Sequence, residues 1–74
     1  MTVYVKNNCP QCHATIKWLT DHHIKFDAIN ISEPINSGKL TWLKALGVRQ
    51  TPYVDTGNKQ WSGFRPDLLN ELVK

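Results

Sequence analysis

The chain has 74 residues, which is enough for one small domain spanning residues 1–74 but not for two lobes with a cleft between them. Hydrophobic residues make up 41% of the chain, so we expect a compact core and not a disordered segment. The net charge is +3 and its nine Lys and Arg residues are scattered singly, a pattern that favours an acidic protein partner and not a nucleic acid.

The first predicted elements are a strand and a helix. Residues 2–6 are mostly β-branched or aromatic and predict a short strand, which Asn7 and Asn8 end. Pro10 suits the first turn of a helix, and the spacing of apolar residues predicts a helix over residues 10–22. Its buried face is expected to contain Cys12, Ile16, Leu19 and His23, with Thr15 and Trp18 beside them, and its solvent-facing side His13, Lys17, Thr20 and Asp21.

A second strand and a second helix follow. Residues 26–31 alternate between apolar and polar and predict a strand, which the sequence Ser-Glu-Pro at 32–34 breaks. A helix is predicted over residues 37–46, and Gly47 is its stop signal. Its buried face is expected to contain Leu40, Leu43 and Leu46.

The last third of the chain predicts a hairpin and a short helix. Residues 52–55 and 59–61 flank the turn sequence Thr-Gly-Asn and are expected to pair. Residues 62–65 form a loop, and Pro66 opens a helix. The apolar face of this helix is expected to contain Leu68, Leu69, Leu72 and Val73.

The order of elements is βαβαββα, which indicates an α/β fold. A strand, a helix and a strand in succession predict a right-handed crossover and a parallel pair, to which the hairpin adds antiparallel strands. We therefore expect a four-stranded mixed sheet flanked by three helices, which lie on both of its faces. No apolar run approaches the roughly 18 residues of a membrane span, and the first residues do not resemble a signal peptide, so we expect a cytoplasmic protein.

Cys9 and Cys12 are the only cysteines, and they lie between the first strand and the first helix. A disulfide between them would close a ring too small to stabilise the fold much, so we expect a chemical role. Unpaired backbone N–H groups at a helix start favour a thiolate at Cys9, and Lys6 is close enough to add positive potential. Cys9 is therefore expected to be an exposed nucleophile, and Cys12, one turn deeper, the shielded resolving thiol.

The cysteine pair has three other interpretations. Cys9, Cys12 and His13 match the pattern for c-type haem attachment, but that modification normally requires export. Zinc held with His22 and His23 is disfavoured because those residues lie about 15 Å along the helix from the cysteines. A purely structural pair would have no reason to sit at a helix start. We therefore expect no metal site.

Pro52 follows Thr51 directly before the third strand. Only about 5–6% of X–Pro bonds in folded proteins are cis, so the dipeptide alone predicts a trans bond and a proline that lacks a ladder hydrogen bond.

Three segments together resemble the NrdH-redoxins over essentially the whole chain: Cys-Pro-Gln-Cys at 9–12, Thr-Pro at 51–52 and Trp-Ser-Gly-Phe-Arg-Pro-Asp at 61–67. The resemblance implies a thioredoxin fold and a cis Thr51–Pro52 bond that faces the dithiol. It implies a monomeric dithiol–disulfide oxidoreductase that reduces the large subunit of class Ib ribonucleotide reductase and is itself reduced by thioredoxin reductase. No cofactor is bound, and NADPH and FAD act only through that reductase.

The same resemblance assigns supporting roles to residues around the dithiol. The residues expected to tune the reactivity of the thiols are Lys6, Pro10 and Gln11. The residues expected to bind the substrate backbone are Thr51 and Pro52. The residues expected to contact a protein partner are Arg49, Gln50, Trp61, Ser62, Gly63, Phe64 and Arg65. For Trp61, packing in the core and contact with a partner are equally weighted.

Two alternatives remain open. A glutathione-dependent glutaredoxin would carry acidic residues after a Gly-Gly pair to hold the glutathione end groups, whereas Phe64 and Arg65 follow Ser62-Gly63 here. Asp67 keeps the ability to act as such an acceptor, and Pro10 is more typical of glutaredoxins. The non-enzymatic alternative is a small module in which the thiols bind a metal or a partner.

Overall fold

The computed structural model describes residues 1–73. Its elements follow the predicted order with small changes at their ends: β1 (Thr2–Val5), α1 (Pro10–Asp21), β2 (Asp27–Asn30), the 3₁₀ turn η1 (Pro34–Asn36), α2 (Ser37–Ala45), β3 (Tyr53–Asp55), β4 (Gln60–Ser62), α3 (Pro66–Leu69) and the 3₁₀ turn η2 (Asn70–Val73). The 3₁₀ turn η1 occupies part of the segment that the sequence predicted only as a break.

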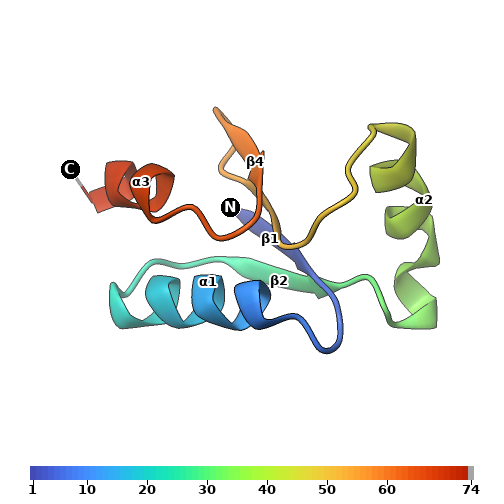
Figure 1. The fold of residues 1–74 in the computed structure, drawn as a ribbon, viewed down its shortest axis with the longest axis horizontal. Coiled ribbons are helices and arrows are strands. Elements are labelled where there is room, and N and C mark those ends of the chain that lie inside the picture. Colours follow the sequence, from blue (N-terminus) through green and yellow to red (C-terminus); the bar gives the residue numbers. More distant parts are fainter. Residues whose placement is uncertain (74) are drawn as a thin grey trace.

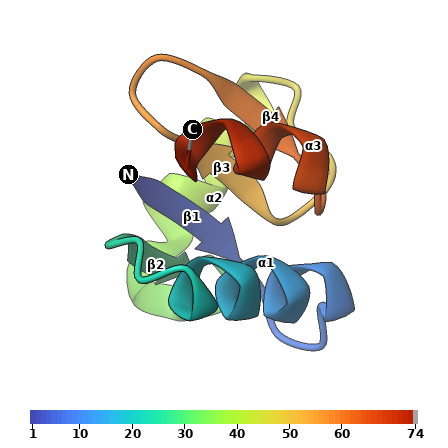
Figure 2. The ribbon, with the colours of Figure 1, turned by 90° about the vertical axis from the view of Figure 1, so that its left-hand side faces the viewer.

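The four strands form one mixed sheet in the order β2-β1-β3-β4. β1 pairs in parallel with β2, while β3 pairs antiparallel with both β1 and β4. The predicted four-stranded mixed sheet is therefore confirmed. In Figure 1 the strands lie between α2 on the right and α1 and α3 on the left, and in Figure 2 α1 and α3 lie in front of the sheet with α2 behind it.

Alternating side chains of the strands build a core on each face of the sheet. Val3, Val5 and Val54 point to the face covered by α1 and α3, where they pack with Leu19 and Leu69. The other face carries a smaller cluster under α2: Tyr4, Ile31 and Leu43, with Leu40, Val48 and Tyr53 packed against it. Two helical layers therefore hold the end of β1, and with it the start of α1, in place.

The prediction that His23 lies on the buried face of α1 is wrong. The helix ends at Asp21, and His23 is exposed with a left-handed φ of 56°. The amide of Ile24 donates to the carbonyl of Leu19 at 3.0 Å, so the chain leaves the helix through a Schellman-type turn. A residue in this position points away from the face that the helical spacing assigned to it.

Leu46 is 53% exposed, contrary to the prediction that it completes the buried face of α2. The helix closes there with Gly47 at a φ of 83° and a hydrogen bond of 3.0 Å from the Val48 amide to the Leu43 carbonyl. Val48 consequently packs beside Leu43, in the place that the spacing assigned to Leu46.

Leu72 and Val73 are also exposed, at 37% and 50%, so their predicted burial is wrong. Regular α-helix stops at Leu69, and the chain continues in the tighter 3₁₀ turn η2. Because a 3₁₀ turn has three residues per turn instead of 3.6, the side chains after Leu69 rotate off the face that packs on the sheet. Within residues 1–73 no helix is long and apolar enough to cross a membrane.

Candidate active site

The two cysteines lie where β1 gives way to α1, and they form a disulfide in this structure. Cys9 is the N-cap of α1, with extended φ and ψ angles of −122° and 96°, and Pro10 occupies the first helical position. Asn8 just before it has a left-handed φ of 55°, a conformation that Asn tolerates better than most residues. The loop therefore places Cys9 at the start of α1, as the sequence predicted.

Several dipoles surround the sulfur of Cys9. The amide of Cys12 donates to Cys9 Sγ at 3.2 Å, and the hydroxyl of Thr51 lies 3.5 Å from the same sulfur. The first turn of α1 carries no acidic residue that would neutralise the partial positive charge of the helix start. Hydrogen bonds to a charged form favour that form, so we expect these groups to favour a thiolate at Cys9 once the disulfide is reduced.

The expected exposure of Cys9 is not seen in the oxidised form. Cys9 is 5% exposed and Cys12 is 2% exposed, so both sulfurs lie at the edge of the core. The Thr51 side chain, itself buried, covers Cys9 from the side. The difference in exposure between the two thiols has the predicted direction but is small.

The Thr51–Pro52 peptide bond is cis, as the resemblance implied. The carbonyl of Thr51 lies 3.7 Å from Cys9 Sγ, so this loop packs directly on the cysteine pair. The carbonyl of Pro52 accepts a hydrogen bond of 2.8 Å from the amide of Gly63. That bond fastens the loop at 62–65 to the same corner of the molecule.

Gln11 joins three separate segments around the disulfide, a role that the sequence did not indicate. Its side-chain carbonyl accepts hydrogen bonds from the Phe64 amide at 3.0 Å and from Gln50 Nε2 at 3.2 Å. Gly63 lies against both glutamines, and a Cβ there would lie 3.1 Å from Gln11 Oε1 and 3.3 Å from Gln50 Nε2. Only glycine therefore fits this junction without a shift.

Arg65 and Asp67 form a bidentate ion pair at the start of α3. Nε and Nη2 of Arg65 donate to the two oxygens of Asp67 at 3.1 and 2.8 Å. The hydrogen bonds from Arg65 lower the pKa of the Asp67 carboxyl, and those same bonds raise the pKa of the Arg65 guanidinium. Asp67 is thus engaged by a cation of its own chain.

The remaining predicted partner-binding residues divide between core and surface. Trp61 is only 7% exposed and belongs to the core under α3, although its indole N–H has no hydrogen-bond partner within the described chain. Ser62 ends β4, while Phe64 is partly buried and Arg49 is exposed. The core role weighed for Trp61 is the one that its burial supports.

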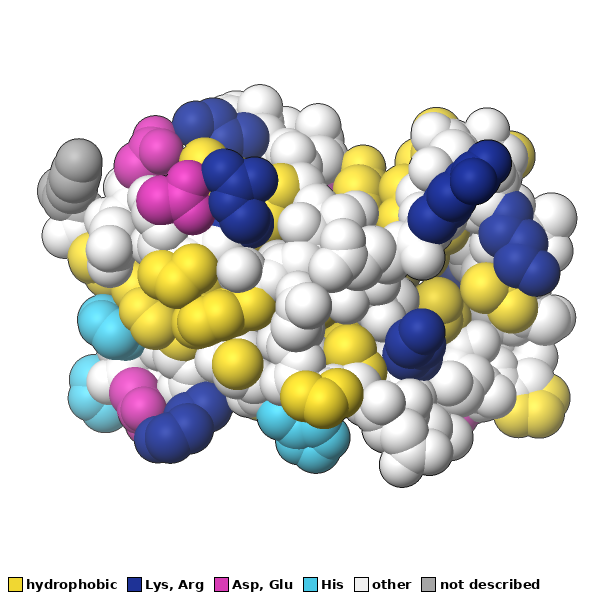
Figure 3. All heavy atoms as spheres, viewed as in Figure 1, with side chains coloured by type: hydrophobic (Ala, Val, Ile, Leu, Met, Phe, Trp, Pro, Cys, Tyr) yellow, Lys and Arg dark blue, Asp and Glu magenta, His cyan; other side chains and the backbone are white. Residues whose placement is uncertain are grey.

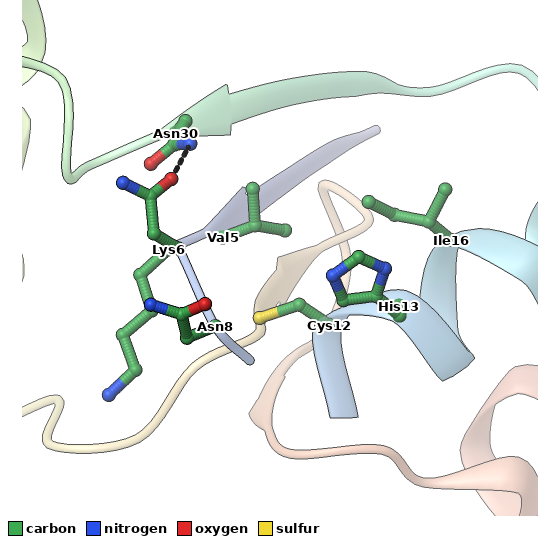
Figure 4. Close-up of a pocket in the computed structure, with 8 residues that line it drawn as sticks. Val5, Lys6, Asn8, Cys12, His13, Ile16 and Asn30 are labelled. Carbon is green, nitrogen blue, oxygen red and sulfur yellow. Dashed lines mark hydrogen bonds between the residues drawn. The ribbon is translucent and has the colours of Figure 1, made fainter. Parts of the chain in front are cut away.

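A hollow of about 490 Å³ opens beside Cys12, and Figure 4 looks into it. Its lining includes two ionisable side chains, Lys6 and His13, beside the disulfide-bonded Cys12. Asn30, which also lines the hollow, donates to Asn7 Oδ1 at 2.9 Å, the dashed line in the figure. This contact fastens the loop before Cys9 to β2. The sequence gives no signal for it, because the two asparagines are 23 positions apart.

The histidines that were candidate metal ligands lie apart from the cysteine pair, at the far end of α1. Within residues 1–73 no group of three or more His, Cys, Asp or Glu side chains is placed to hold a metal ion. His22 stacks on Trp18 with ring centroids 3.8 Å apart, and its Nδ1 lies 2.8 Å from the Trp18 carbonyl. Its surroundings are therefore explained by packing at the end of α1.

A cysteine pair at a helix start, a cis-proline loop against it and this sheet order define a thiol–disulfide redox protein with a thioredoxin-like fold. Comparison with known proteins agrees. The family model described as Glutaredoxin matches residues 1–61. The glutaredoxin-like protein NrdH of Lactococcus lactis subsp. lactis is 44% identical over 74 residues, covering 99% of both chains.

Two further relatives narrow the assignment. The glutaredoxin-like protein NrdH of Salmonella typhimurium is 40% identical over 72 residues, covering 97% of this chain and 86% of the relative. The solved structure of NrdH-redoxin from Escherichia coli superposes with a TM-score of 0.83 at 41% identity, covering 96% of this chain and 91% of that one. The chain belongs to the glutaredoxin family and, within it, to the NrdH-redoxins.

Proposed function

We propose that this protein is a cytoplasmic electron carrier that reduces the large subunit of class Ib ribonucleotide reductase and is itself reduced by thioredoxin reductase. It holds no cofactor of its own in this proposal, because NADPH and FAD belong to the reductase. The solved E. coli relative is described as having a thioredoxin-like activity profile, which supports the choice of thioredoxin reductase over glutathione as the electron source.

The Arg65–Asp67 ion pair is the observation that favours thioredoxin reductase over glutathione as the electron source. In a glutaredoxin, acidic residues in this region accept hydrogen bonds from the glutathione end groups. Here both oxygens of Asp67 already accept hydrogen bonds from Arg65, and the positive charge of this arginine repels an approaching ammonium. This arrangement favours protein partners over glutathione.

The proposed reaction uses the two cysteines in sequence. The Cys9 thiolate attacks one sulfur of the substrate disulfide, forming a mixed disulfide and releasing the other substrate sulfur as a thiolate. Cys12 then loses its proton and attacks Cys9 Sγ, which frees the second substrate thiol and leaves the Cys9–Cys12 disulfide. Two electrons have moved from the carrier to the substrate, and two electrons from thioredoxin reductase restore the dithiol.

The test compares reductants for the oxidised protein. Purified protein is offered NADPH with thioredoxin reductase, or glutathione with NADPH and glutathione reductase, and reduction is followed by NADPH consumption. We expect efficient turnover only with thioredoxin reductase. Efficient turnover with glutathione alone would favour the glutaredoxin alternative and overturn the proposal.

Cysteine variants then test the two-step reaction. Cys9→Ser should abolish turnover, and Cys12→Ser should accumulate a mixed disulfide with ribonucleotide reductase that is visible on a non-reducing gel. Full multiple-turnover activity of Cys12→Ser on a protein disulfide would show that Cys12 is not the resolving thiol. Stoichiometric zinc in protein purified under reducing conditions would instead support the thiol-ligand alternative.

A further inference from the structure

A groove of about 340 Å³ runs between the end of β1, helix α2 and the loop that precedes the cis-proline. Its floor is aliphatic and contains Leu43, which is 2% exposed, and Ile31, which is 9% exposed. Leu40 and Val48 extend this floor. A floor of this kind offers hydrophobic contact to an aliphatic side chain.

One end of the groove reaches the redox centre. Thr51 lines the groove, and its hydroxyl lies 3.5 Å from Cys9 Sγ. A chain segment lying in the groove would therefore reach Thr51, the residue whose hydroxyl contacts Cys9 Sγ. No other hollow described in residues 1–73 combines an aliphatic floor with contact to the cis-proline loop.

The rim of the groove is positively charged. Lys6, Lys44 and Arg49 line it, and no Asp or Glu does. The salt bridges within residues 1–73 use other cations, namely Lys17, Lys59 and Arg65, so these three rim cations have no carboxylate partner in the described chain. In Figure 3 dark-blue side chains surround yellow ones over α2 on the right, whereas most magenta side chains gather at the opposite end.

We infer that this groove receives a segment of the protein substrate next to the substrate's disulfide, and that the segment carries an aliphatic side chain and carboxylates. The aliphatic side chain packs on the floor of the groove and the carboxylates pair with the rim cations, which supply charge complementarity. This inference rests on the proposed function, since it describes how that function selects its protein substrates.

The test uses synthetic oxidised peptides and the reduced protein. One peptide carries a leucine and two glutamates beside an internal disulfide, and its twin replaces both glutamates with glutamines. Oxidised glutathione is a third substrate. The second-order rate constant for reduction of each is measured for the wild type, for Lys44→Glu and for Lys39→Glu.

Lys39→Glu is the matched control. Both lysines lie on α2 and both substitutions change the net charge equally, but Lys39 lies over the Trp42 ring and outside the groove. We expect Lys44→Glu to slow reduction of the glutamate peptide about three- to tenfold, which corresponds to the loss of one or two partly exposed ion pairs. The glutamine peptide, and both peptides with Lys39→Glu, should change less than about twofold.

Each of the other outcomes would contradict one part of the inference. Equal slowing by Lys44→Glu and Lys39→Glu would show that net charge, and not the groove, attracts the acidic peptide. Equal slowing of both peptides by Lys44→Glu would show that no carboxylate is bound there. Slowing confined to oxidised glutathione would assign the groove to a small thiol. Failure of the wild type to reduce either peptide would refute the inference about the groove, whereas the proposed function would fail only if ribonucleotide reductase also stayed oxidised. If Lys44→Glu does not fold, Lys44→Gln gives the same comparison.

Discussion

Replacing Gly63 with alanine should destabilise the protein by two separable effects. Gly63 has a left-handed φ of 89°, which costs an L-residue roughly 1–2 kcal/mol. In addition, the new Cβ would lie 3.1 Å from Gln11 Oε1 and 3.3 Å from Gln50 Nε2. If the contact displaces Gln11 from its two hydrogen bonds, a further loss of about 1–2 kcal/mol is expected. The total is about 2–4 kcal/mol.

Gly57 provides the matched control for the backbone effect. Its φ is 97°, but a Cβ there would meet nothing within 4 Å. Gly57→Ala should therefore lose only the conformational part, about 1–2 kcal/mol. Gly38, on helix α2, has no left-handed φ and open space around it, so Gly38→Ala should stabilise the protein by up to about 1 kcal/mol.

Urea denaturation of the oxidised wild type and of the three glycine variants measures how much each substitution changes the free energy of unfolding. For a domain of this size, each 1 kcal/mol corresponds to about 4–8 °C in Tm, so thermal unfolding gives an independent measurement. The difference between Gly63→Ala and Gly57→Ala isolates the contact with the glutamines. A Gly63→Ala variant that is no less stable than Gly57→Ala would refute the interpretation that Gly63 is required by close packing.

Three other substitutions test the surroundings of the disulfide. Thr51→Val removes the hydroxyl near Cys9, so alkylation of reduced Cys9 by iodoacetamide at pH 7 should slow about three- to tenfold, the effect of one ordinary hydrogen bond, because the contact is long at 3.5 Å. Asp67→Asn removes a carboxyl whose pKa is lowered by Arg65. That pair stabilises the fold above the unfolded-state pKa of about 4 and ceases to do so as the pH falls through the lower folded-state value, so the wild type should exceed the variant in stability at pH 7 and match it near pH 2. Gln11→Met removes the acceptor of the amide that follows Gly63, and hydrogen exchange of that amide should accelerate about three- to tenfold.

Each of these predictions has a control or a contradicting result. Thr51→Ser keeps the hydroxyl and should retain most of the alkylation rate, whereas an unchanged rate in Thr51→Val would mean that the hydroxyl does not stabilise the thiolate. A stability gap for Asp67→Asn that persists at pH 2 would exclude the ion pair as its cause. Gln60→Met, whose amide bonds only Asp55 in the described chain, should leave the monitored exchange rate unchanged.

The periodicity of the sequence predicted the elements well because each depends on near neighbours. Strands such as 2–5 alternate across a sheet with two covered faces, and Pro10 and Pro66 both begin helices where they were expected to. Helix ends were less predictable. His23 and Leu46 fit the helical spacing, but Schellman-type turns rotate the chain before those positions can be buried.

The redox cysteines could be predicted because their chemistry depends on local spacing, whereas the junction around them depends on distant contacts. Gln11 bonds residues 39 and 53 positions away, and no short motif encodes such a contact. The ion pair of Arg65 with Asp67 is local, yet the sequence alone left Asp67 free to accept another donor. Only the geometry shows that each of its oxygens accepts a hydrogen bond from Arg65.

The side-chain carbonyl of Gln11 affects the free energy with which the proposed partners would bind. It fixes the cis-proline loop through Gln50 and the loop before α3 through Phe64 while the protein is still alone. Loops that are ordered in advance lose little conformational entropy when a partner docks, so less of the contact energy is spent on freezing them. Fewer contacts are then needed for a specific complex, which would suit the proposed carrier, because it has to release one protein before it meets the next.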